Sequence, residues 1–252
     1  MRETGKGRAR EGFLARAGPG ADPGPAGRRL LAWREVSARS TGQWRSSLHA
    51  AAEVLGVPHD GALQEAVDAA EVCAGDKRPA PFAAAQVFAF ARRALTPNAG
   101  RQPLGGRGGE GELLAAGLAD CVLAQRLKWP FALPLIAAPL FAGRGGRAGD
   151  DVGDGDDGAI VFAYAKGAER ACDLSAELGR RAQKLLAAQA KLRAKGAPAA
   201  LEALLDDDSL SASAKIGGQL SERGARRLFD RLVALGAVRE LTGRATFRLY
   251  GL

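Results

Sequence analysis

Apolar residues recur every three or four positions over most of this chain, which is the spacing of one face of an α-helix. Between residues 28 and 195 the pattern predicts a helical body of five to seven helices. The apolar stripes lie within residues 30–36, 44–55, 63–73, 81–95, 113–127 and 160 to about 195. Asp60 and Pro81 suit helix starts, whereas Gly56 and Gly196 suit helix ends.

Stretches rich in glycine and proline interrupt this pattern. Residues 96–111 and 143–158 are predicted as loops within the body, and residues 1–27 as a disordered basic leader. The apolar segment 129–142, WPFALPLIAAPLFA, contains three prolines and is shorter than the roughly 20 residues of a membrane span. We therefore expect a buried irregular segment there and no membrane insertion.

From residue 198 onward the elements become shorter and more varied. A short helix is expected over residues 199–205, a second helix begins with Ser209 or Ser211 as its cap, and Ser221 caps a third. Residues 237–250 then predict two strands, 237–241 and 245–250, joined by a turn with glycine at position 243.

Three helices followed by a β-hairpin is the order of a winged helix-turn-helix domain. The predicted fold class is therefore mainly α, with a multi-helix N-terminal body over 28–195 and a winged helix-turn-helix over 198–252. The third helix would be the recognition helix, whose first turns enter the major groove of DNA. Its apolar face is predicted to point inward, at positions Ala225, Leu228, Phe229, Leu232 and Leu235.

The predicted DNA contacts come from this helix and from the hairpin that follows it. Arginine can form a fork with guanine or hold a phosphate group. The candidate DNA-binding residues are Ser221, Glu222, Arg223, Arg226, Arg227, Arg239, Arg244 and Arg248.

Charge is concentrated in the same part of the chain. The 252 residues carry a formal charge of +8, but residues 180–252 hold 14 Lys and Arg against seven Asp and Glu. Residues 30–179 hold 15 and 18. A basic C-terminal part on a mildly acidic body fits a polyanion partner, although abundant arginine in an Ala- and Gly-rich chain explains the surplus equally well.

The cysteines and the absence of a secretory apolar stretch near Met1 indicate a cytoplasmic protein. Cys73, Cys121 and Cys172 are odd in number and widely spaced, so we expect buried free thiols. Trp33 and Trp44 are expected in one core.

Candidate enzyme and cofactor motifs are weak, so we expect no enzyme, cofactor or metal. Residues 106–111 fit G-x-G-x-x-G but lack a preceding strand, and the aspartates of 150–157 lack the spacing of a calcium loop. His49 and His59 have no recognisable catalytic partner at a fixed spacing.

Several segments resemble a family known as domain of unknown function 1403, found mainly in alphaproteobacteria and often on plasmids. They are DPGPAGRRLLAWR, PAPFAAAQVFAFA, LADCVLAQRLKWPFALPL, KLRAKGAPAALEALLDDDSLSASA and ERGARRLFDRLVALGAVRELTGRATFRLYGL, together covering roughly residues 21–252. The resemblance implies a helical protein of unknown activity with a terminal helix-turn-helix-like region. It also implies a truncated or misassigned start, because members usually have a further helical stretch upstream.

Two functional hypotheses stay open. The first is binding of duplex DNA through the winged helix, as in a transcriptional regulator, with RNA as a minor variant. The second is a protein–protein adaptor in which the winged domain docks a partner or dimerises, and in either case the helical body can supply a homodimer or partner surface.

Overall fold

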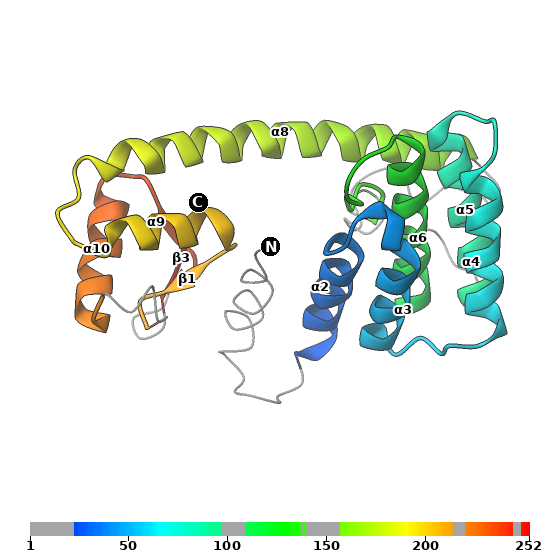
Figure 1. Cartoon of the computed structure of the whole chain (residues 1–252), viewed down its shortest axis with the longest axis horizontal. Helices are drawn as coiled ribbons and strands as arrows, with labels where there is room; N and C mark the ends of the chain where they lie inside the picture. Colours follow the sequence, from blue (N-terminus) through cyan, green and yellow to red (C-terminus); the bar gives the residue numbers. More distant parts are fainter. Residues whose placement is uncertain (1–22, 97–108, 138, 140–156, 214–219, 244–247) are drawn as a thin grey trace. The chain divides into compact units, whose positions relative to one another are not determined.

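The computed structural model in Figure 1 describes residues 23–96, 109–137, 139, 157–213, 220–243 and 248–252. Its contacts divide the chain into two compact units. Here Gly24–Ala171 is the helical unit, and Cys172–Leu252 is the C-terminal unit. The boundary falls inside one helix, α8 (Asp157–Gln189), which the sequence pattern had assigned entirely to the body.

The helical unit confirms the predicted run of helices. Its elements are α2 (Gly24–Ser37), the 3-10 turn η1 (Thr41–Gln43), α3 (Trp44–Leu55), α4 (Gly61–Ala74), α5 (Ala80–Leu95), α6 (Glu110–Arg126) and the first part of α8. Figure 1 shows α4 and α5 side by side, and α5 also packs along α6.

The predicted helix boundaries have their expected local causes. Gly56 ends α3 in the left-handed region at φ 72°, where glycine has no Cβ to strain. The Asp60 carboxylate accepts hydrogen bonds from the N–H groups of Ala62 and Leu63, and so caps α4. Helix α5 begins with Pro81 in its first turn.

Helix α6 lies at the centre of the helical unit. Every residue from Glu112 to Ala124 is buried, so this helix has no solvent face along those turns. Trp44 is buried in the same core and Trp33 packs against it, as expected. Gly117 of α6 faces Val36 and Trp33 of α2 in this core.

The segment that follows α6 is irregular, as expected, but it is only partly buried, because Phe131 and Leu133 are exposed. We call residues 129–137 the proline-rich segment; Ala132, Leu135 and Ile136 lie in the core. Thr41 fastens it, because its N–H donates to the Pro130 carbonyl at 3.0 Å and its hydroxyl to the Trp129 carbonyl at 2.9 Å. In the described part of the chain, no helix is both long and apolar enough to cross a lipid bilayer.

The C-terminal unit combines helices with a small antiparallel sheet. After the remainder of α8 come α9 (Ala197–Asp206), β1 (Leu210–Ser211), α10 (Glu222–Ala234), β2 (Arg239–Glu240) and β3 (Leu249–Gly251). The strand order is β1-β3-β2, with Leu210 opposite Tyr250 and Arg239 opposite Gly251.

The core of this unit joins the end of α8 to α9, α10 and the sheet. Leu185 of α8 is fully buried together with Leu204 and Leu232. The rings of Phe229 and Tyr250 stack with centroids 4.5 Å apart, which fixes α10 against β3.

Three expectations differ from the structure or lie outside it. The prediction of a helix that begins at Ser209 is wrong, because Leu210 and Ser211 form β1. Residues 214–219, where that helix was expected to continue, lie outside the described residues. Cys172 is exposed, whereas Cys73 and Cys121 are buried. Leu174 and Leu178, in the same predicted apolar stripe of α8, are exposed as well.

Candidate functional site

Helix α10 carries four of the predicted DNA-binding residues, Glu222, Arg223, Arg226 and Arg227, and the fifth, Ser221, is its N-cap. The Ser221 hydroxyl accepts a hydrogen bond from the Gly224 N–H at 3.2 Å and caps the helix. The apolar face is buried as predicted, at Ala225, Leu228, Phe229 and Leu232. The opposite face therefore points to solvent.

Arginines occupy this exposed face. Arg223, Arg227 and Arg231 lie one turn apart, and all three are exposed. Arg226 is also exposed but forms an ion pair with Glu222, four residues before it. Among the described residues, Arg223 and Arg227 have no acidic partner within ion-pair distance, which leaves their guanidinium groups available to an anion.

The hairpin after α10 is shaped by one carboxylate. Glu240 accepts hydrogen bonds from the Thr242 N–H at 2.8 Å and the Gly243 N–H at 2.9 Å, and Gly243 has φ 61°. The Thr242 hydroxyl also donates to this carboxylate. That hydrogen bond first, and then those from the two N–H groups, hold the pKa of Glu240 below its usual value. Arg248 forms an ion pair with Asp230 of α10 at 3.7 Å. Arg244 lies outside the described residues.

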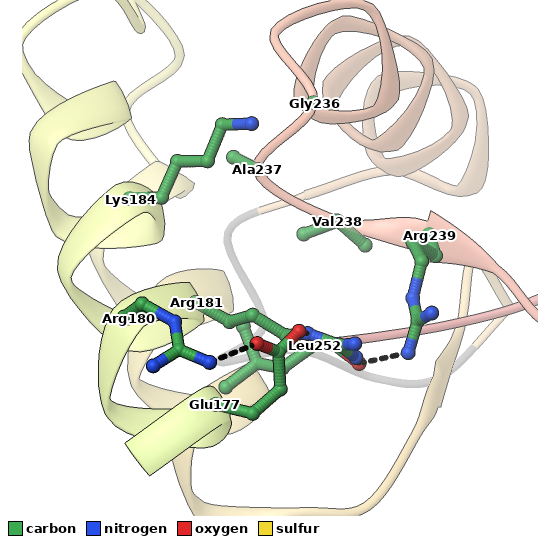
Figure 2. A pocket seen from close by; sticks show the side chains of 9 residues that line it. All are labelled: Glu177, Arg180, Arg181, Lys184, Gly236, Ala237, Val238, Arg239 and Leu252. Carbon is green, nitrogen blue, oxygen red and sulfur yellow. Dashed lines mark hydrogen bonds and ion pairs between the residues drawn. The ribbon is translucent and has the colours of Figure 1, made fainter.

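Arg239 lies at the other end of α10 from Ser221. Its guanidinium Nη2 donates to the main-chain oxygen of Leu252 at 3.4 Å. Figure 2 shows it at the edge of a cavity of about 350 Å³, opposite side chains of α8. The structure thus brings Ser221, Glu222, Arg223, Arg226 and Arg227 together and places Arg239 apart from them.

The cavity, which we call the α8–β2 cavity, was not predicted from the sequence. Its charged side chains are Glu177, Arg180, Arg181, Lys184 and Arg239. The sequence does show cations three and four residues apart on α8, at Arg180, Arg181 and Lys184, which indicates a basic helix face. The pattern could not show that the end of α8 packs against the segment that follows α10, since that contact is set by tertiary structure.

The helical unit contains two sets of buried polar side chains. Arg92 and Glu112 form an ion pair at 3.0 Å with each side chain only 5% exposed. Asp120 is buried and accepts a hydrogen bond from the Ile136 N–H at 3.4 Å. Burial raises the pKa of Asp120 well above its usual value, and interactions with the proline-rich segment and the Tyr164 hydroxyl offset this only in part.

These buried groups fasten elements together and do not converge on an open site. Burial also raises the pKa of Cys121 to about 12, so its thiol is protonated and unreactive. The rings of His49 and His59 come within 5.1 Å, a pairing that spacing alone could not indicate. Within the described ranges, no three His, Cys, Asp or Glu side chains gather as a metal site requires.

Comparison with protein families gives one match. The model of the family "Protein of unknown function (DUF1403)" matches residues 3–252, beginning upstream of the first segment on which the resemblance was based. Comparisons with curated proteins and with solved structures gave no match. The chain belongs to the DUF1403 family.

Proposed function

We propose that this DUF1403 protein binds duplex DNA through its C-terminal unit. In this proposal the unit is a winged helix-turn-helix, the first turns of α10 enter the major groove, and the β2–β3 hairpin meets the sugar-phosphate backbone. The observation that carries the proposal is the exposed arginine face on a helix whose opposite face is buried.

The order of elements supports this assignment. In a winged helix, a short strand precedes the recognition helix and pairs with the second strand of the hairpin that follows it. Here β1 precedes α10 and pairs with β3, giving the order β1-β3-β2. This strand pairing supports the proposed winged helix-turn-helix, although the sequence did not predict β1.

The charge arrangement supports DNA as the ligand. Arg223 and Arg227 are separated by one helical turn, so both guanidinium groups lie along one side of the first turns. The helix N-terminus adds a partial positive charge that favours phosphate at the same end. The ion pair between Glu222 and Arg226 must open or rotate before Arg226 contacts DNA.

A salt titration with a charge-matched control tests the proposal. Arg223, Arg226 and Arg227 are changed together to Ala in one protein, and Lys191, Lys195 and Arg193 in another. The control residues are exposed on the connection between α8 and α9 and remove the same charge.

We expect the wild type and the control to bind duplex DNA with an affinity that falls steeply with salt. The Arg variant should bind at least about 100-fold more weakly at fixed salt. Its slope of log affinity against log salt should be lower by up to about 3. Salt-independent binding by the wild type, or equal affinity of the two triple variants, would show that α10 is not the recognition helix.

The adaptor hypothesis has one observation of its own. Leu174 and Leu178 lie one turn apart on α8 with exposed fractions of 58% and 41%. Large apolar side chains adjacent on a helix favour a protein contact. Replacing both with Glu should abolish any self-association measured by sedimentation and leave DNA affinity unchanged, and sedimentation as a monomer by the wild type would remove dimerisation from this hypothesis.

A further inference from the structure

The α8–β2 cavity is formed by two stretches that the C-terminal core holds in place. On α8, Leu185 and Ala188 are buried, so the neighbouring stripe through Arg181 and Lys184 lies at the edge of that core. Across the cavity, residues 236–239 leave the end of α10, and Ala237 and Val238 are buried. The backbone on both sides of the cavity is therefore held in place by the buried core of the C-terminal unit.

Cations outnumber anions among its side chains. Glu177 is the one carboxylate side chain among the described residues that line it, facing three cations of α8 and Arg239 of β2. The carboxylate accepts from Arg180 at 2.7 Å and from Arg181 at 2.5 Å, and these bonds lower the pKa of Glu177. Four cationic side chains face this one carboxylate, so the side chains that line the cavity keep a positive surplus.

The cavity already binds one oxygen with two guanidinium groups. Arg181 of α8 donates to the main-chain oxygen of Leu252 at 3.0 Å, and Arg239 of β2 donates to the same atom at 3.4 Å. Figure 2 shows both side chains directed toward Leu252 from opposite sides. Two arginines from separate elements thus converge on a single acceptor.

Lys184 supplies a further donor. Its ammonium group lies close to Gly236, where a Cβ would come within 3.0 Å of Nζ, and Gly236 adopts φ 63°. No acceptor within hydrogen-bond distance of Nζ is found among the described residues. Three donors of the ammonium group therefore face the cavity or solvent.

We propose that the α8–β2 cavity binds a small phosphorylated ligand, with phosphate oxygens held by Lys184, Arg239 and Arg180. Donors from three separate cations suit an anion with several acceptor oxygens and close to two negative charges, which describes phosphate better than carboxylate. A volume of about 350 Å³ fits a ligand of nucleotide size or smaller.

This site is distinct from the proposed DNA interface. The 13 residues of α10 separate Gly236 from Ser221 by roughly 20 Å along the helix axis. The inference therefore does not depend on DNA binding, and each can fail alone.

Isothermal titration of the full-length protein tests the site, with pyrophosphate and ATP as probes and adenosine as the uncharged comparison, at a constant ionic strength of about 0.15 M. The test variant is Lys184→Gln with Arg239→Gln. The matched control is Lys191→Gln with Arg193→Gln, which removes the same charge from the exposed α8–α9 connection.

We expect saturable binding of one phosphate probe per chain, no binding of adenosine, and at least a tenfold loss in the test variant alone. Lys184→Gln by itself should also weaken binding, and it breaks none of the hydrogen bonds described above, so the result does not depend on whether Arg239→Gln folds. Absence of saturable binding, or an equal loss in both double variants, overturns the proposal.

Duplex DNA distinguishes a free ligand from the nucleic-acid backbone. If a short duplex displaces pyrophosphate, and Lys184→Gln with Arg239→Gln weakens DNA binding as much as the α10 triple variant, the cavity is a backbone contact and the small-ligand proposal is wrong. If DNA affinity is unchanged while pyrophosphate binding is lost, the small-ligand site is supported.

Discussion

Replacing the buried Asp120 carboxyl should change how the stability of the helical unit depends on pH. Asp120 is 1% exposed, and its Oδ2 and the Tyr164 hydroxyl both lack a hydrogen-bond partner in good geometry. Burial raises the pKa of Asp120 well above 3.8, so the folded protein retains a proton that the unfolded chain releases. Asp120→Asn has nearly the same shape and is neutral at every pH.

The magnitude follows from proton linkage. Above about pH 4 the unfolded carboxyl is ionised while the folded carboxyl stays neutral, so the stability that this raised pKa provides is lost as pH rises. Between these two pKa values the wild-type free energy of unfolding should fall, relative to Asp120→Asn, by about 1.4 kcal/mol per pH unit.

Urea unfolding followed by tryptophan fluorescence provides the assay, because Trp33, Trp44 and Trp129 all lie in the helical unit. Measurements from about pH 4.5 to about pH 7.5 should show a gap between the two proteins that widens with pH. Asp68→Asn, on the exposed surface of α4, controls for the loss of a carboxylate. Parallel profiles for the wild type and Asp120→Asn would refute the argument that Asp120 is neutral in the folded protein.

Further substitutions test the packing and one helix cap. Glu112→Leu removes one partner of the buried ion pair with Arg92 and should lower the free energy of unfolding in urea by up to about 3–5 kcal/mol. Adding Arg92→Met should restore part of this loss, and additive effects of the two substitutions would count against the ion pair. Gly167→Ala places a Cβ against a carbonyl oxygen of the proline-rich segment and should cost about 1–3 kcal/mol. Gly179→Ala, on open surface of the same helix, should instead raise thermal stability by up to about 1 kcal/mol, and the reverse order would contradict this packing. Ser221→Ala removes the α10 cap and should lower stability by about 1 kcal/mol, and Ser221→Asp should retain it.

The parts of the fold that depend on local chemistry could be predicted from the sequence. The start of α4 at Asp60, the end of α3 at Gly56 and the cap of α10 at Ser221 each rest on contacts within a few residues. The buried face of α10 followed from spacing alone, because one helix face was apolar.

The parts set by distant contacts could not be predicted. Strand β1 has only two residues, and its backbone is extended because it pairs with β3, some 40 residues later. The exposure of Cys172 depends on where the two units divide α8 between them. The α8–β2 cavity likewise exists only because Leu185 packs in the same core as α10.

The sharing of α8 also has a consequence for synthesis of the chain. Ile160 and Tyr164 complete the core of the helical unit, while Leu185 and Ala188 begin the core of the C-terminal unit. During synthesis, therefore, the apolar surface of α2 to α6 is fully covered only after the first turns of α8 have left the ribosome. The same emerging helix then presents the first apolar surface on which α9 and α10 can fold, so completion of one unit directly precedes nucleation of the other.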